Sequence, residues 1–475
     1  MSDITVPPGV ATGGKKLRSN HLNFIEVVSQ SVGVIAPSGT PGLVIPVVFA
    51  TAGNGTWLAY LFATIALVVV GLQINVFSSR IATPGSLYVY AGHGLGRFAG
   101  VVTGWALLIG YVFTAAAVID GTIATFVGVL QSVGLNLSGL PLNLMLSLLF
   151  VGVAFVLGWR DIRLSTRTTL IAEFSTLALI LLAIVIWFVH HGSVVDTAQT
   201  GLQGVNPGTI RLGLVLAFFS FVGFEAATVL GVESQQPRKF IPRAVLASVA
   251  TVGILFVVAA YGLTDAFHGN ATTLDQSSAP FAVVTAAFHA PALGVVISAG
   301  VALSFFTCIL ASINSAARVL YALSHHGLFH ASAQNTHDKH ASPHIALSFS
   351  TIVALLLALG LLFSGWDELS AYGILGSLAT YGFLLAYSLV TIAAPVYLYR
   401  HGELKTQHVV SALVAVVLLA VVIFGTVYPV PSWPYNILPY IFLALVALGV
   451  VYFLVLRAVA PQRLAQVEAE TLGAL

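Results

Sequence analysis

The stretch "SVGVIAPSGTPG" (residues 31–42) lies inside the first long apolar segment of the chain. It contains three glycines, two prolines and three hydroxyl side chains. Gly and Pro weaken or break helices, and backbone groups left unpaired in lipid cost several kcal/mol each. A break inside a membrane span is tolerated where the unwound backbone lines a polar cavity. The stretch therefore predicts an interrupted first span whose helix ends face a ligand.

The composition is that of an integral membrane protein. The chain is 58% hydrophobic and 7% charged, against about 25% charged residues in a soluble domain. Apolar segments near the roughly 20 residues that cross a bilayer recur along the whole chain. They predict an all-α integral membrane fold of about twelve transmembrane helices, at 24–51, 56–78, 97–130, 143–158, 165–190, 208–232, 243–265, 292–324, 343–363, 370–398, 407–428 and 437–457.

The distribution of charge predicts the orientation. With the N-terminus in the cytoplasm, every Lys and Arg except Arg211 and Arg318 falls in a cytoplasmic end or loop. The positive-inside rule then places both termini inside the cell and the protein in the cytoplasmic membrane. A single transmembrane domain over 21–458 is expected between cytoplasmic tails at 1–20 and 459–475. The basic excess orients a membrane protein and is no sign of nucleic-acid binding.

A second interruption is predicted in the sixth span, "FFSFVGFEAATVLGVESQQPRKFIP" (218–242). Its centre holds Gly223 and Glu225, and an acid in the middle of an apolar span indicates function. Many secondary transporters contain two inverted five-span repeats that each begin with a discontinuous helix. Here the repeats would cover about 24–190 and 208–398, with two appended helices at about 407–457. The N-termini of half-helices attract anions and their C-termini attract cations, which suits a zwitterionic amino acid.

Several motifs resemble those of the amino acid–polyamine–organocation (APC) superfamily over nearly the whole chain. They are "ATPGSLYVYAGHGLGRFAGVVTGWALLIGY" (82–111), "FVGFEAATVLGVESQQPRKFIPRA" (221–244), "INSAARVLYALSHHGL" (313–328) and "ASPHIA" (341–346). The resemblance implies a LeuT-like fold and secondary active import of an amino acid or related amine, with a proton as the coupling ion. It implies no enzyme activity and no cofactor.

The sequence departs from the family pattern at two places. Amino-acid-binding members often have Gly-small-Gly at the first break, whereas this chain has Pro37-Ser38-Gly39. The substrate's carboxylate is then held differently, or the substrate lacks one. Some proton-coupled members place a Lys midway along span 5, where this chain has Glu173 and no Lys. Lysine-type proton coupling is therefore not expected.

The candidate substrate-binding residues flank the two breaks. In the first break, N–H groups and hydroxyls are expected to bind a carboxylate of the substrate, and backbone carbonyls are expected to bind an amine. In the second break, an aromatic ring is expected to cover the apolar part of the substrate. The residues are Ile35, Ala36, Ser38, Gly39, Thr40, Phe221, Gly223 and Glu225. The structural alternatives are a simple proline kink and an ordinary packing Phe.

Three intramembrane acids are candidates for coupling or cation binding: Glu225, Asp120 in span 3 and Glu173 in span 5. Each can carry a proton or pair with a substrate amine. The alternatives are a hydrogen bond from Glu225 to unwound backbone and a position for Asp120 near the outer water. Thr307 in span 8 is a possible sodium ligand, or a hydroxyl bonded back to its own helix.

Other function classes are less well supported. Residues 325–344 contain six histidines. A solvated loop is the preferred interpretation of this segment, over a pH sensor or a metal site, and no metal site is predicted. A polyamine or organic-cation transporter, an exchanger and a sodium symporter stay open as alternatives, and a channel is a distant one. An intramembrane enzyme is disfavoured because H-E-x-x-H and G-x-S-x-G are absent. The sequence leaves the oligomeric state open.

Overall fold

The computed structural model describes residues 17–160, 162–277, 279–338, 340 and 342–459. Regular structure in these residues is helical, apart from one isolated parallel bridge between Leu22 and Ser234. The α-helices are α1 (Phe24–Ile35), α2 (Gly39–Ala52), α3 (Thr56–Ser78), α4 (Leu87–Leu95), α5 (Arg97–Ser132), α6 (Leu140–Arg160), α7 (Ile162–His191), α8 (Thr197–Thr200), α9 (Pro207–Phe219), α10 (Pro237–Phe267), α11 (Pro280–Ala287), α12 (Pro291–His325), α13 (His344–Phe363), α14 (Glu368–Arg400), α15 (Thr406–Val427) and α16 (Leu438–Val459). Short 3₁₀ turns lie at η1 (Gly53–Gly55), η2 (Ala226–Leu230), η3 (Leu274–Gln276) and η4 (Ala331–Gln334).

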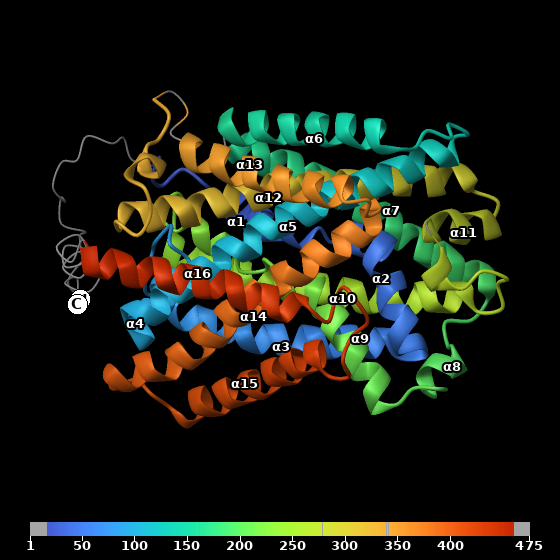
Figure 1. Cartoon of the computed structure of the whole chain (residues 1–475). Helices are drawn as coiled ribbons and strands as arrows, with labels where there is room; N and C mark the ends of the chain where they lie inside the picture. The colour runs from blue at the N-terminus through green and yellow to red at the C-terminus, as the bar shows by residue number, and fades with distance from the viewer. Residues whose placement is uncertain (1–16, 161, 278, 339, 341, 460–475) are drawn as a thin grey trace.

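The long helices form one elongated bundle (Figure 1). Ten stretches of the described residues are long and apolar enough to cross a membrane, which confirms the predicted all-helical membrane fold. The first of them, Phe24–Ser78, contains two of the predicted spans. The predicted sixth span contains the short helix α9 and the 3₁₀ turn η2 and, in these described residues, no helix of spanning length. The total of twelve spans therefore stays a prediction.

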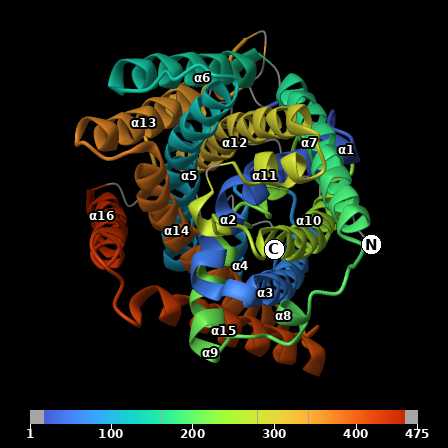
Figure 2. The same ribbon diagram turned by 90° about the vertical axis from the view of Figure 1, so that its right-hand side faces the viewer.

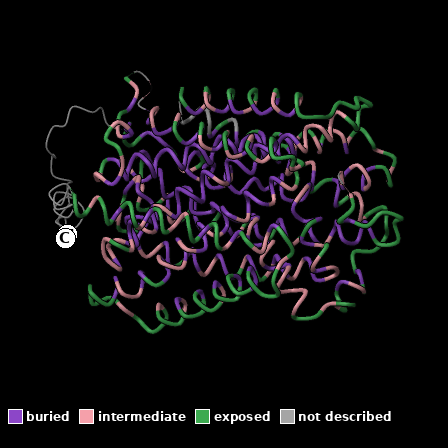
Figure 3. The backbone as a smooth tube through the Cα atoms, in the orientation of Figure 1, coloured by how far each residue is buried: buried purple, intermediate pink, exposed green. Residues whose placement is uncertain are grey.

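Helix α5 packs against both α12 and α14 at the centre, and α6, α15 and α16 lie at the rim (Figure 2). Small residues permit this close packing. A Cβ atom at Gly382 of α14 would lie 2.6 Å from the Ala106 carbonyl oxygen of α5. Such contacts drive helix association where lipid removes the hydrophobic force. Buried residues fill the interior and exposed residues lie along the rim (Figure 3), and many of the exposed residues are large and apolar.

The first break lies at residues 36–38, between α1 and α2. Helix α1 begins with a capping box in which Asn23 and Glu26 each bond the other's backbone N–H, so Glu26 lies in the first turn of the helix. It ends at Ala36, whose φ of +51° is left-handed. That conformation ends a helix, and Pro37 cannot donate the next helical hydrogen bond. The sequence thus stops and restarts the helix where the break is predicted.

The second break lies at residues 220–225, between α9 and η2. The chain turns at Gly223, whose φ of +84° favours glycine. It then continues as a single 3₁₀ turn, η2, and not as a second long half-helix before α10. The interruption of span 6 therefore lies at the predicted position. An α-helix precedes this break and only a 3₁₀ turn follows it, whereas span 1 has an α-helix on each side of its break.

A buried ion pair fixes the segment that follows the second break. Arg318 of α12 donates from Nε and Nη2 to the two carboxylate oxygens of Glu233, at 2.6 and 3.0 Å. The backbone around Glu233 also pairs with residues 20–22, just before α1. Both residues come from the motifs that resemble the APC superfamily, and the fold brings the two motifs together.

Candidate functional site

At the first break, the carboxylate of Glu173 reaches the start of α2 from α7. Its Oε2 accepts the backbone N–H of Ser38 at 3.1 Å and a further short hydrogen bond from the Ser38 hydroxyl. The N-terminus of a helix carries unpaired N–H groups and a partial positive charge, which a carboxylate satisfies. Glu173 therefore occupies the anion position that the sequence analysis assigned to a substrate carboxylate.

Two hydroxyls of α12 complete this cluster. Ser304 Oγ donates to Glu173 Oε1 at 2.6 Å and accepts the N–H of Gly39 at 3.0 Å. Thr307 Oγ1 lies 3.2 Å from Glu173 Oε1 and 2.9 Å from the Ser304 carbonyl oxygen. The first break is thus bonded to α7 and α12 through one carboxylate and three hydroxyls. We call Ser38, Glu173, Ser304 and Thr307 the Glu173 cluster.

At the second break, Glu225 accepts hydrogen bonds from two tyrosines on other helices. Tyr111 of α5 donates to Oε1 at 2.6 Å, and Tyr387 of α14 makes a short hydrogen bond to Oε2. The Tyr387 hydroxyl also accepts the N–H of Gly223 at 3.2 Å. Glu225 and the turn it follows are therefore anchored on the central helices by one pair of hydroxyls.

The two breaks touch each other. A Cβ atom at Gly223 would lie only 2.0 Å from Val34 Cγ1, in the last turn of α1. The N–H of Ala227 donates to Ser31 Oγ of α1 at 2.9 Å. Phe221 instead packs on Phe256 of α10, with ring centroids 5.0 Å apart. Movement of either break must therefore displace the other.

Both breaks are closed off from solvent in this conformation. The exposed fractions of Ile35, Ala36 and Thr40 are 4%, 3% and 3%. Ser38, Glu173, Phe221 and Glu225 are at 0%. Among the described residues, neither Glu173 nor Glu225 forms an ion pair. An isolated buried carboxylate ion is costly, so each of these acids calls for a proton or another cation.

Asp120 does not join either cluster. Its side chain is fully buried, and neither carboxylate oxygen has a hydrogen-bond partner in the described part of the chain. The neighbouring Gly121 packs on Tyr372 and Phe305, and the Phe305 ring also covers Gly39 at the start of α2. Asp120 is therefore fully buried in this conformation, and its position relative to the outer water stays a prediction.

The structure brings together only part of the candidate set. Ser38, Gly39, Glu173 and Thr307 form one group, and Gly223 and Glu225 form another. Whether Ile35, Ala36, Thr40 and Phe221 contact a substrate stays a prediction.

Three residues of these two groups were not predicted from the sequence: Ser304, Tyr111 and Tyr387. Ser304 lies one helical turn before Thr307, a spacing that signals a shared face. Tyr111 ends the quoted stretch 82–111, and no signal singled out Tyr387.

The His-rich segment is less solvated than expected at one position. His326 Nδ1 lies 2.6 Å from the Tyr88 hydroxyl. Burial, and to a smaller extent His325, lowers the pKa of His326 to about 4. His326 is therefore neutral near neutral pH, which weakens a role for it as a pH sensor.

This fold defines a class of protein: an all-helical, multi-pass membrane protein with two interrupted helices packed together at its centre. The chain belongs to the amino acid permease family, a family of transporters, whose sequence profile matches residues 27–461.

Curated relatives cover most of the chain. A branched-chain amino acid permease of Bacillus subtilis is 25% identical over 403 residues, which is 81% of this chain and 82% of the relative. A methylthioribose transporter of the same species is 24% identical over 422 residues, covering 86% and 88%. A gamma-aminobutyric acid permease of Escherichia coli is 26% identical over 363 residues, covering 72% of each chain.

Proposed function

We propose that this protein is a secondary active transporter that imports an amino acid or related amine across the cytoplasmic membrane, with both termini inside the cell. The observation that carries the proposal is the pair of touching helix breaks, each bonded to the central helices through a buried, uncompensated glutamate. Such breaks mark substrate and coupling-ion sites in transporters. Alternating access then arises when α1, α2, α3, α9 and α10 rock against the remaining helices.

The coupling cation binds at the Glu173 cluster. Glu173 joins the start of α2 to α7 and α12, and it accepts hydrogen bonds from one backbone N–H and three hydroxyls. A proton placed there turns an acceptor into a donor and weakens the carboxylate's hold on the start of α2. Na⁺ is the alternative, since carboxylate and hydroxyl oxygens also suit a hard cation. This assignment selects Glu173 from the three acids that the sequence named for coupling or cation binding, and leaves Glu225 as the anchor of the second break.

The substrate site lies between the breaks. In this proposal the carbonyl groups of Ile35 and Ala36, at the negative end of α1, take an ammonium group. The Ala36 carbonyl oxygen also accepts the N–H groups of Gly39 and Thr40, at 3.0 and 3.2 Å. A substrate carboxylate competes with Glu173 and Ser304 for the N–H groups of Ser38 and Gly39. Substrate and coupling cation are then linked, because a cation at Glu173 frees the N–H groups that the substrate needs.

A cationic substrate is the second candidate. It is favoured by Asp120, a fully buried carboxylate whose oxygens have no hydrogen-bond partner among the described residues. A buried acid of this kind suits the ammonium or guanidinium group of a cationic substrate. Asp120→Asn would then weaken uptake of cationic amines at least tenfold and leave neutral amino acids unaffected.

A binding screen followed by transport tests the proposal. Purified protein is scanned for thermal stabilisation by branched-chain, cationic and γ-amino acids, polyamines and methylthioribose, since a ligand of the folded state raises its stability. Each stabilising compound is then assayed for counterflow in proteoliposomes. Saturable counterflow of an amino acid or amine supports the proposal. Stabilisation and counterflow only by compounds without an amine would overturn the substrate class, and flux that does not saturate would indicate a channel.

A further inference from the structure

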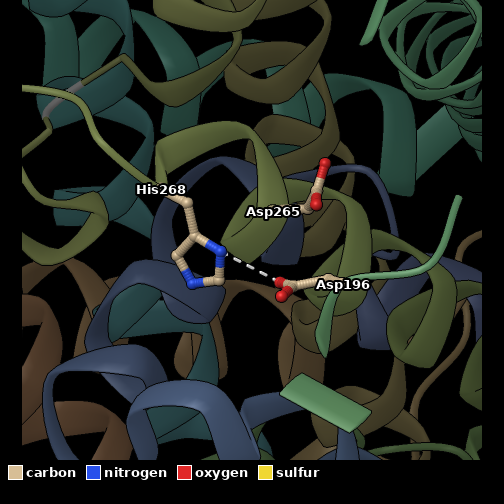
Figure 4. Close-up of side chains that lie close together, drawn as sticks. All are labelled: Asp196, Asp265 and His268. Carbon is tan, nitrogen blue, oxygen red and sulfur yellow. Dashed lines mark ion pairs between the residues drawn. The ribbon is translucent and has the colours of Figure 1, made fainter. Parts of the chain in front are cut away.

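A second group of ionisable side chains lies at the end of the bundle that carries α8, remote in sequence from the breaks (Figures 1 and 4). Asp196 caps α8, Asp265 lies in the last turn of α10, and His268 follows that helix. One possible ligand atom from each of the three lies within 4.8 Å of the others. His268 Nδ1 is 3.0 Å from Asp196 Oδ2.

The hydrogen bonds around His268 fix which ring nitrogen is free. Asn54 Nδ2 donates to the Gln203 carbonyl oxygen at 2.9 Å, so Asn54 Oδ1 must face the imidazole. That oxygen lies 3.0 Å from His268 Nε2, which therefore carries the proton and donates. In the neutral ring, Nδ1 then presents a lone pair directly to a carboxylate oxygen. Two lone pairs at this distance repel unless a proton or a metal ion lies between them.

The charge of the group also calls for a cation. Asp196 and Asp265 are each only 7% exposed. Among the described residues, neither has a Lys or Arg ion-pair partner. Two buried carboxylates a few ångströms apart repel one another and lack water to screen them.

The surrounding residues hold these side chains as the outer shell of a metal site does. Trp187 Nε1 donates to Asp265 Oδ2 at 2.6 Å, and Gln199 Nε2 donates to Asp196 Oδ2 at 2.7 Å. A metal-binding His commonly donates its other N–H to an oxygen, as His268 does to Asn54. The His268 side chain is 38% exposed, which leaves a path for an ion from solvent.

We propose that Asp196, Asp265 and His268 form a binding site for a divalent transition-metal ion of the Zn²⁺ class. One nitrogen and two carboxylate oxygens are ordinary Zn²⁺ ligands, with a water in the fourth position. Bonds of about 2.0–2.1 Å place tetrahedral ligands roughly 3.3 Å apart, so small side-chain rotations suffice. The ion joins the loop between α7 and α9 to the end of α10. In the orientation proposed above this is the outer end of the protein, and the site itself does not depend on the transport function.

Metal titration of the purified, chelator-treated full chain tests the proposal. Micromolar Zn²⁺ is expected to raise the thermal unfolding midpoint, and Mg²⁺, which prefers six oxygen ligands, is not. Asp196→Asn and His268→Gln each remove a ligand and are expected to abolish the Zn²⁺ response. Asn54→Ala removes no ligand but takes away the hydrogen bonds to His268 and to the Gln203 carbonyl oxygen, and it is expected to weaken Zn²⁺ binding about 10–100-fold. His289→Gln, at another exposed histidine, is the control and leaves the response unchanged.

Co²⁺ binding to the wild-type protein provides a readout that needs no variant. Tetrahedral coordination by this site gives an intense visible absorption that Zn²⁺ abolishes. The proposal is overturned if wild-type protein shows neither Zn²⁺ stabilisation nor the Co²⁺ absorption, or if Asp196→Asn and His268→Gln respond to Zn²⁺ as the wild type does. Stabilisation on acidification without any Zn²⁺ response would overturn it too, and would mean that a proton on His268 holds the group together.

Discussion

Each of the two breaks is hydrogen-bonded to neighbouring helices through a buried glutamate, but the two glutamates come from different parts of the molecule. The first break contains no acid and receives the carboxylate of Glu173 from α7. The second break contains its own acid, Glu225, and directs it to Tyr111 and Tyr387. A further acid, Glu233, anchors the same segment to Arg318.

The two breaks therefore have different roles: the second break is held in place, and the first can switch with the charge of Glu173. The second break is attached at both ends through side chains of its own segment. The first break is held by side chains from other helices: Glu173 of α7 accepts the N–H and the hydroxyl of Ser38, and Ser304 of α12 accepts the N–H of Gly39. Changing the charge of Glu173 therefore alters the first break, whereas changing Glu225 mainly loosens the second. Each prediction below probes one side of this contrast.

Loss of the Glu233 anchor should have the largest effect on stability. Glu233→Gln leaves Arg318 buried without its bidentate partner, and breaking a buried ion pair in this way costs about 3–5 kcal/mol. The free energy of unfolding in detergent measures it. A loss below about 1 kcal/mol would mean that the pair is solvated and does not anchor the second break.

A side chain at Gly223 should separate backbone strain from contact between the breaks. Gly223→Ala places an L-residue at positive φ, costing about 1–2 kcal/mol, and overpacks Val34 by about 1–3 kcal/mol more. Gly96→Ala is the matched control, because Gly96 has a φ of +90° with nothing within 4 Å of the added Cβ. Equal losses of unfolding free energy in the two variants would show that the breaks do not press on each other.

The two tyrosines of the second break should differ in cost. Tyr387→Phe removes a donor to Glu225 and also leaves the Gly223 N–H without its acceptor, whereas Tyr111→Phe removes one donor. Hydrogen bonds to charged groups are worth about 1.5–3 kcal/mol, so both variants lose stability and Tyr387→Phe loses more. Thermal unfolding of the two variants side by side gives the order, and the reverse order would contradict the assigned roles.

An exposed glutamate should show the smallest effect. The hydrogen bond from Arg80, followed by its positive charge, holds the pKa of Glu403 below its usual value. A lowered folded-state pKa contributes stability above the ordinary glutamate pKa, and that contribution disappears as the pH falls through the folded value. Glu403→Gln should therefore match wild type at low pH and be slightly less stable at neutral pH. Any change in the pH dependence of uptake in this variant would show that carboxylates outside the breaks take part in coupling.

The sequence predicted the breaks because Pro37 and Gly223 act locally: one removes a helical donor and the other favours a left-handed turn. It predicted the all-helical membrane fold because apolar runs of spanning length leave few alternatives. It did not predict that Glu173 would cap α2, since that contact joins residues 135 positions apart through packing of α7 and α12. Tyr387 was missed for the same reason, because an aromatic residue on a buried helix is compatible with plain packing.

The most direct test of the account compares gradient-driven uptake by Glu173→Gln and Glu225→Gln in proteoliposomes, using the substrate found by the screen. We predict that Glu173→Gln retains counterflow but loses accumulation driven by a pH or Na⁺ gradient, because the neutral amide can no longer respond to a cation. Glu225→Gln should keep the gradient dependence with a lower rate and lower stability. Gradient-driven accumulation at the wild-type level in Glu173→Gln, or its loss only in Glu225→Gln, would contradict the assignment of the coupling site to the first break.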